Sequence, residues 1–161
     1  MSPPPSPTTY QIAVRLLARR DLSTAQLRER LTRRELPIAE IDAAVARLTR
    51  ERVVDDERMA LGRARLAAEI KFRGQRRTRL EIEALGIDRE TARRAVAAVF
   101  DEADEEAVLE RAIARRLTGT IRDRAHFRRL DQALLRQGFP PDRVAAALVS
   151  RAGGDTAFME E

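Results

Sequence analysis

The sequence predicts an all-α protein built as an elongated tandem array of three three-helix repeats, each resembling a helix-turn-helix unit. Charged residues make up 35% of the 161 residues, apolar residues 43% and aromatic residues only 4%, a mixture typical of helices with aliphatic cores. No proline occurs between Ile38 and Phe139, so a long stretch can be helical. In addition, one pattern of turn and helix recurs at offsets of 51 and 52 residues.

The predicted organisation begins with a disordered Pro/Ser-rich lead, residues 1–9, which holds four of the seven prolines and no charged side chain. Three-helix repeats then follow at residues 10–54, 55–100 and 101–150. Residues 151–161 are expected to form a flexible tail.

In the first repeat, apolar spacings of three and four residues predict three helices. Ser23 and Gln26 form a capping box that opens the second helix, and Pro37 occupies the first turn of the third. The apolar positions are Tyr10, Ala13, Val14 and Leu17 in the first helix, Leu27 and Leu31 in the second, and Ile38, Ile41, Val45 and Leu48 in the third.

The second repeat is predicted to open with a long helix that starts at Asp55 and runs to about Phe72. Gly74 is expected to end this helix as a C′ glycine. A second helix with Leu80 and Ile82 follows, and Gly86 then provides a left-handed turn.

The third repeat is predicted to start with an acidic segment, residues 101–106, which suits the positive end of a helix dipole. Gly119 interrupts this helix, Asp123 caps the next one, and Gly138 makes the turn before the last helix.

The turns at Glu35, Gly86 and Gly138 define the repeat, and an apolar residue stands four positions before each of them. Three small helices bury too little surface to be stable alone, so neighbouring repeats should share apolar faces. The alternative is one compact bundle whose turns look alike by chance, because the matching stretch is short. Expected core residues are Leu27, Leu31, Ile41, Val45, Ile82, Val96, Leu134, Phe139 and Val144.

The residue inventory excludes several function classes. With no cysteine and one histidine, His126, the chain cannot form disulfides, thiol sites or Cys/His zinc sites. It lacks a glycine-rich phosphate loop and any nucleophile with a partner histidine, so we expect no enzyme, no metal and no cofactor. Without a signal peptide or an apolar span, a soluble cytoplasmic protein is expected.

Basic residues carry the main functional signal. The formal net charge is +5, and 30 of the 31 basic residues are arginine, a bias that genome composition explains and that still supplies phosphate-binding guanidinium groups. The first two repeats are basic, whereas the remainder has 10 basic and 12 acidic residues. The densest cluster is predicted as a phosphate-contacting ridge, with a solvated helix face as the alternative. It contains Arg63, Arg65, Lys71, Arg73, Arg76, Arg77 and Arg79.

Two modes of nucleic-acid recognition are disfavoured. The helices that would read bases begin with acids and continue with alanine, so sequence-specific major-groove reading is not expected. Five Phe and one Tyr are scattered at spacings typical of core packing, which argues against stacking on single strands.

Several segments of this sequence resemble the regulatory protein RecX family, bacterial modulators of the RecA recombinase. The likeness extends from Tyr10 to about Val149, and the segment from Gly74 to Ile87 is its most specific part. The matching segments are Leu16 to Arg20, Val54 to Ala60, Gly74 to Ile82 with Leu85 to Ile87, and Arg136 to Phe139. Glu35, Met59 and Thr78 depart from the family pattern, and they put local stability in doubt more than function.

The resemblance implies a nonenzymatic regulator of DNA repair, homologous recombination and the SOS response. It would bind the RecA filament on single-stranded DNA as a monomer, with weak direct DNA binding, and inhibit recombinase, ATPase and co-protease activities. The implied binding surface is the arginine cluster of the second repeat, with Arg28, Arg33 and Arg34 as a secondary patch. A basic helical module that binds DNA without a recombinase is the alternative, and an inert scaffold comes third.

Overall fold

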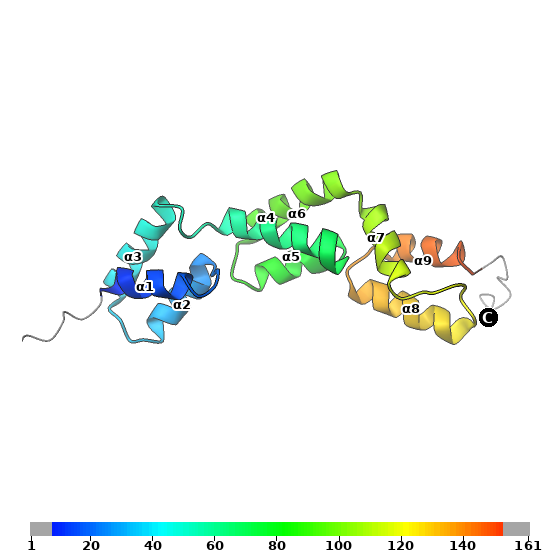
Figure 1. Ribbon diagram of the computed structural model, residues 1–161, viewed down its shortest axis with the longest axis horizontal. Coiled ribbons are helices and arrows are strands. Elements are labelled where there is room, and N and C mark those ends of the chain that lie inside the picture. The colour runs from blue at the N-terminus through cyan, green and yellow to red at the C-terminus, as the bar shows by residue number, and fades with distance from the viewer. Residues whose placement is uncertain (1–7, 153–161) are drawn as a thin grey trace, which may run out of the picture.

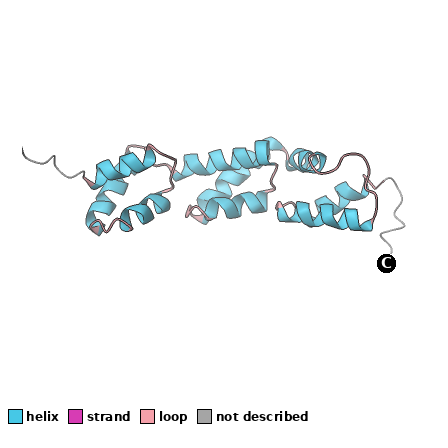
Figure 2. Ribbon diagram, turned by 60° about the horizontal axis from the view of Figure 1, so that its bottom comes forward, coloured by secondary structure: helices cyan, strands magenta, loops and turns pink. Residues whose placement is uncertain are grey.

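The structure is a computed structural model, and it describes residues 8–152. In this part of the chain every regular element is a helix, and the helices follow one another in three consecutive groups of three (Figure 1). The groups lie end to end along one axis instead of surrounding a common centre (Figures 1 and 2). The predicted all-α tandem array is therefore confirmed, and the compact-bundle alternative is wrong.

We call the three groups units 1, 2 and 3. Unit 1 contains α1 (Thr9–Leu17), α2 (Thr24–Thr32) and α3 (Ile38–Arg50). Unit 2 contains α4 (Asp56–Leu66), its π-helical continuation η1 (Ala67–Lys71), α5 (Gln75–Glu83) and α6 (Arg89–Ala103). Unit 3 contains α7 (Glu105–Ala114), α8 (Arg124–Arg136) and α9 (Pro141–Val149).

The two ends of the predicted organisation fall mostly outside the described residues. Of the lead at residues 1–9, only the last two residues are described: Thr8 caps α1 through a capping box with Gln11, and Thr9 is already helical. Of the tail at residues 151–161, only Arg151 and Ala152 are described, and they form a turn after α9.

Side-chain caps begin several helices where the sequence places them. Ser23 accepts a hydrogen bond from the N–H of Gln26, Asp55 accepts one from Arg58, and Asp123 caps α8. Each cap satisfies a backbone donor that the first helical turn leaves free. Pro37 lies one position earlier than predicted, because it is the N-cap of α3 and not a residue of its first turn.

The turn after the second helix is left-handed in every unit, which confirms the predicted repeat. The φ angle is 56° at Glu35, 80° at Gly86 and 90° at Gly138. Glu35 was expected to disfavour this conformation and nevertheless adopts it, at a cost of about 1 kcal/mol relative to glycine.

All nine predicted core residues are buried, with exposed fractions between 0 and 4%. Thr78, expected to weaken the core, is also buried, and its hydroxyl donates a hydrogen bond to the carbonyl of Gly74 at 2.9 Å. Unit 1 has its own apolar cluster, whereas units 2 and 3 share a single one. The expectation that neighbouring units share apolar faces therefore holds fully for only one pair.

The long helix of unit 2 ends next to Phe72, as predicted, but the role predicted for Gly74 is wrong. Phe72 itself adopts the left-handed conformation (φ 49°), while Gly74 has φ −75° and is the N-cap of α5. One predicted repeat boundary is also wrong. At the start of unit 3, α6 continues to Ala103, so the boundary at residue 101 falls inside a helix. Asp101 and Glu102 consequently lie in the last turn of α6, and only the acids from Asp104 onward precede or open α7.

Units 1 and 2 meet at the start of α2. The hydroxyl of Ser23, the N-cap of α2, donates a hydrogen bond to the carbonyl of Leu85, the residue before the turn glycine of unit 2. The N–H of Thr24, the first residue of α2, donates to Asp56 Oδ1 at 2.8 Å. Asp56 is the first residue of α4, so a carboxylate meets a helix N-terminus.

Units 2 and 3 meet at the equivalent positions. The N–H of Gly74, the N-cap of α5, donates to the carbonyl of Gln137 at 2.9 Å. The N–H of Gln75, the first residue of α5, donates to Glu105 Oε1 at 3.2 Å, and Glu105 is the first residue of α7. Equivalent positions thus form two hydrogen bonds at each joint, although the N-cap donor is a side-chain hydroxyl at Ser23 and a backbone N–H at Gly74.

Glycines make these joints close enough to form. A Cβ atom added at Gly86 would lie 2.5 Å from Cβ of Ala25, and one added at Gly74 would lie 2.5 Å from the carbonyl oxygen of Gly138. A Cβ at Gly138 would overlap the backbone of Arg77. Gly74 is therefore needed for close approach between units and not for a helix end.

Replacing Gly74 by alanine should lower the free energy of unfolding by more than about 2 kcal/mol, because the added methyl group meets backbone atoms that cannot turn away. Urea denaturation followed by circular dichroism measures this change. Gly62→Ala is the control: Gly62 lies inside α4 with open space around a new Cβ, so that variant should gain up to about 1 kcal/mol. Equal stability of the two variants would contradict this account of the joint.

Candidate binding surface

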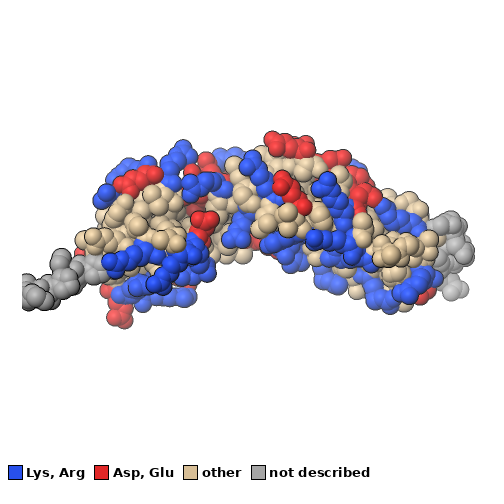
Figure 3. Space-filling model, viewed as in Figure 1, with Lys and Arg blue, Asp and Glu red and all other residues tan. Residues whose placement is uncertain are grey.

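Basic side chains gather along one edge of the molecule. The space-filling view shows Lys and Arg along the lower, concave edge, where α2, α5 and α8 lie in the ribbon view, while acids are more frequent along the convex edge (Figures 1 and 3). These three helices are the second helices of the units. We call the arginines of α2, α5, α8 and the turn after α2 the basic edge. They are Arg28, Arg30, Arg33, Arg34, Arg76, Arg77, Arg79, Arg124, Arg128, Arg129 and Arg136.

Three arginines of the predicted ridge form ion pairs inside unit 2. Arg73 and Arg77 both bind the carboxylate of Glu81, the second through Nε to Oε1 at 2.9 Å. Arg79 lies 3.6 Å from Glu83 Oε1. The Arg73 side chain is only 21% exposed, so this pair stabilises the fold.

The Arg77 guanidinium also takes part in the joint between units 2 and 3. Its Nη1 donates a hydrogen bond to the carbonyl of Arg136 at 3.0 Å. The two arginine ion pairs and their hydrogen bonds lower the pKa of Glu81 against the opposing effect of its burial, which is the largest single influence on that carboxyl. Glu81 therefore remains a carboxylate that organises the cations around it.

The other four ridge residues make no ion pair within residues 8–152. Arg63 and Lys71 line one small groove, where α4 and η1 face α5, and Glu81 lies in the same groove. Arg65 follows Arg63 by two positions and thus projects from nearly the opposite side of α4. The seven predicted residues therefore do not form one continuous ridge.

Arg76 belongs to a different groove, of about 490 Å³, where α5 meets the end of α8. Arg76, Arg77 and Arg136 surround an apolar floor that includes Leu80, which is 50% exposed. This groove combines three guanidinium groups from two units with an apolar surface.

The predicted secondary patch in unit 1 is partly neutralised. Arg28 pairs with Asp42, and Arg33 pairs with Glu29 at 2.5 Å. Arg34 makes no ion pair within the described residues. These are exposed pairs, which contribute little stability and exchange readily with an incoming anion.

Counting charges by repeat missed the contribution of α8. Residues 101–161 hold more acids than bases, but α8, the second helix of unit 3, contains four arginines and a single acid, Asp131. Arg128 and Arg129 stand 52 positions after Arg76 and Arg77, and both are exposed. The repeat offset could therefore have found them, since equivalent positions of a tandem array present the same face.

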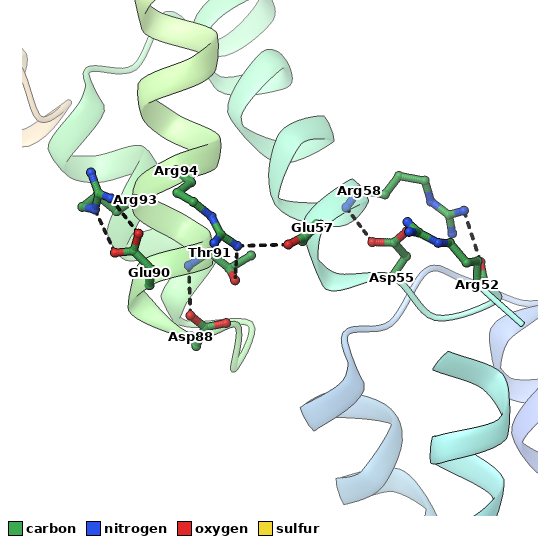
Figure 4. Close-up of polar contacts among 9 residues, drawn as sticks. All are labelled: Arg52, Asp55, Glu57, Arg58, Asp88, Glu90, Thr91, Arg93 and Arg94. Carbon is green, nitrogen blue, oxygen red and sulfur yellow. Dashed lines mark hydrogen bonds and ion pairs between the residues drawn. The ribbon is translucent and has the colours of Figure 1, made fainter. Parts of the chain in front are cut away.

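The start of unit 2 is a second polar cluster (Figure 4). Asp55 accepts the N–H of Arg58 at 2.9 Å and Nη1 of Arg52 at 3.1 Å, while the Arg58 side chain folds back to the carbonyl of Arg52. Because it accepts the backbone N–H of Arg58, the Asp55 carboxyl has a lowered pKa. This cluster fixes the linker between α3 and α4.

The described residues contain neither a cluster of metal ligands nor a membrane-spanning helix. Within residues 8–152, no three acidic or histidine side chains lie close enough together to hold a metal ion. In the same range, no helix is both long and apolar enough to cross a membrane.

A tandem array of three-helix units with a basic edge defines a class of helical-repeat binding proteins, and comparison with known proteins identifies the family. The family model for the first three-helix domain of RecX matches residues 10–48. A regulatory protein RecX of Stenotrophomonas maltophilia is 33% identical over 147 residues, covering 89% of this chain and 87% of that protein. The RecX of Thermobifida fusca is 35% identical, covering 80% and 70%. The chain therefore belongs to the RecX family of regulatory proteins.

Two further comparisons define the extent of the likeness. The RecX of Geobacillus kaustophilus is 31% identical over 155 residues, and this chain spans about half of that protein's length, 56%. The crystal structure of RecX from Lactobacillus salivarius has a TM-score of 0.71 at 16% identity, covering 89% of this chain and 94% of that one. The structural match supports the fold.

Replacing Arg73 by alanine should lower the free energy of unfolding by about 1 kcal/mol, because Glu81 loses one of its two guanidinium partners. Arg76→Ala removes a side chain that makes no ion pair within residues 8–152, so it should change the free energy of unfolding by less than about 0.5 kcal/mol. Thermal and urea denaturation of both variants test this distinction. Equal losses of stability in the two variants would contradict the distinction between a structural Arg73 and an unpaired Arg76.

The cap at Asp55 should make part of the stability pH-dependent. Its folded pKa lies below the unfolded value of 3.8, so the stabilisation is complete above that value and is lost as pH falls through the lower, folded pKa. Asp55→Ala should cost about 1 kcal/mol at pH 7, and the difference from wild type should shrink below about pH 4. Urea denaturation across this range measures it; a constant difference would contradict the assignment.

Proposed function

We propose that this chain is a nonenzymatic regulator that binds the RecA filament on single-stranded DNA and inhibits its recombinase, ATPase and co-protease activities. Membership of the RecX family supports a regulatory role. The observation that supports filament binding is the basic edge, which extends over the second helices of all three units (Figure 3).

The shape and chemistry of this edge suit a long polyanionic partner. An elongated array offers a contact surface that runs along a filament, and guanidinium groups bind phosphates and carboxylates bidentately. We assign the main contacts to exposed arginines that make no ion pair within the described chain, above all Arg76, Arg128 and Arg129. Arg63, Lys71 and Arg34 are secondary, and Arg73, Arg77 and Arg79 act mainly by shaping the surface.

The alternative is a module that binds naked DNA without a recombinase. The same exposed arginines favour it, because phosphate contacts need no protein partner. The two functions differ in their readouts. A DNA-binding module should bind an oligonucleotide with an affinity that falls steeply with salt, and it should inhibit the recombinase only by competing for DNA.

The test adds the purified protein to RecA assembled on single-stranded DNA and follows ATP turnover, strand exchange and co-sedimentation. Wild type should slow ATP turnover and strand exchange even when far fewer molecules of it are present than recombinase subunits. The triple change Arg76→Ala, Arg128→Ala and Arg129→Ala should weaken filament binding at least tenfold, because several charge-assisted contacts are lost.

A matched control removes the same charge elsewhere. Arg93, Arg94 and Arg143 lie on the third helices and pair with Glu90, Glu57 and Glu106. Their alanine triple should leave filament binding within about threefold of wild type. Equal losses of filament affinity in the two triple variants would mean that only the net charge matters and would overturn the assignment of these contacts. If wild type has no effect on the filament, the proposed function is wrong.

A further inference from the structure

A wide groove lies where unit 1 meets unit 2, and it shares Arg63 with the small groove between α4 and α5. It has a volume of about 740 Å³, and its walls are α1 with the turn that follows it, and α4 with the linker that precedes it. The lining is mainly aliphatic and contains no aromatic residue, so it offers no platform for stacked bases. Its apolar side chains are Val14, Leu17, Ala18, Leu22, Val53, Met59 and Leu66.

Exposed apolar side chains concentrate at this groove. Of the six large apolar residues that are exposed in the described chain, Val14, Val53 and Leu66 line it, with 37, 42 and 36% of their surface accessible. Ile70, 58% exposed, lies one turn beyond Leu66 along the same side of the helix. Clustered apolar exposure of this kind is typical of interaction sites.

Gly62 forms part of the groove lining, and nothing inside the molecule requires a glycine there. It lies within α4, where glycine is unfavourable relative to alanine, and a Cβ built on it meets no atom within 4 Å. Close contacts with a neighbouring unit explain why residues 74, 86 and 138 are glycines, but Gly62 has no such contact. A glycine with free space above it, on the floor of an apolar groove, allows another backbone to approach closely.

The free charges of the groove differ between its two walls. Arg63 on the α4 wall makes no ion pair within the described residues, and Asp21 on the α1 side makes none either. Asp55 and Arg58 also line the groove, but both are committed to the linker cluster (Figure 4). An occupant that complements these walls has an apolar face flanked by an acid on the side toward Arg63 and a base on the side toward Asp21.

From these observations we infer that the groove between α1 and α4 docks an amphipathic helix of a protein partner. That helix has apolar residues three and four positions apart, a small residue that packs against Gly62, and an acidic side chain that faces Arg63. Resting on the proposed function, we assign the helix to a subunit of the recombinase filament. The groove then supplies a protein contact that is independent of the phosphate contacts of the basic edge.

The test fills the groove without disturbing the fold. Gly62→Leu places a side chain in open space and removes a helix-destabilising glycine, so the variant should unfold no more easily than wild type. Ala145→Leu, at an exposed position inside α9, is the matched control. Affinities for the RecA filament and for a naked single-stranded oligonucleotide are measured for wild type and both variants, together with sedimentation velocity.

The expected result is a loss of at least tenfold in filament affinity for Gly62→Leu, with oligonucleotide affinity unchanged and with Ala145→Leu like wild type. Filament binding by wild type and Gly62→Leu alike would overturn the groove assignment and leave the proposed function standing. Absence of wild-type filament binding would overturn both. If Gly62→Leu loses oligonucleotide affinity as well as filament affinity, the groove assignment is wrong. It is also wrong if wild type self-associates and Gly62→Leu does not, because the groove would then bind a second copy of this chain.

Discussion

The joint between successive units is the interaction on which the shape of this molecule depends. In both joints the N-cap of a second helix donates a hydrogen bond to the carbonyl before the next unit's left-handed glycine, and the first N–H of that helix meets a carboxylate. Small units bury little surface alone, so such a joint must fix orientation with few atoms. Glycine lets the units approach closely: Gly74 and Gly138 lie against backbone of the neighbouring unit, and Gly86 lies against the Cβ of Ala25.

The same joint explains why Glu35 is tolerated where the other two turns have glycine. Gly86 and Gly138 each press against the preceding unit, but the turn at Glu35 is exposed, and the described chain has no unit ahead of it. Glu35 therefore bears only the backbone cost of the left-handed conformation. Unit 3 differs at its free second helix, where α8 extends by an extra turn capped by Asp123, so the position equivalent to Gly74 is His126 inside the helix.

Much of the fold could be predicted from sequence because helix periodicity, caps and positive-φ turns are local signals. The buried Leu31, Ile82 and Leu134 and the cap at Ser23 are examples. Gly74 was misread because a glycine needed for contact with residue 138 looks, in one dimension, like a glycine that ends a helix. The π-helical end of α4 has no sequence signature of its own, since its register depends on packing.

The candidate surface was harder to predict, for a related reason. A cluster of cations in sequence says how much charge is present, whereas its availability depends on partners such as Glu81, which engages Arg73 and Arg77. Conversely, the net charge of residues 101–161 concealed the arginines of α8, because the acids of this segment lie mostly outside that helix. Charge must therefore be assigned helix by helix in an array whose second helices share one edge (Figure 3).

The two joints also differ in how much apolar surface they bury, and the apolar groove lies at the joint that buries less. Units 2 and 3 share one core, so their facing side chains are covered by each other, whereas unit 1 closes its own core. The first joint consequently rests on the contacts of Ser23, Thr24 and Gly86, and it leaves Val14 and Leu66 partly exposed beside it. A joint held by a few hydrogen bonds opens more easily than one held by a shared core. Any ligand that fills the space between α1 and α4 therefore adds apolar contacts at the joint that, in the described residues, has no shared core.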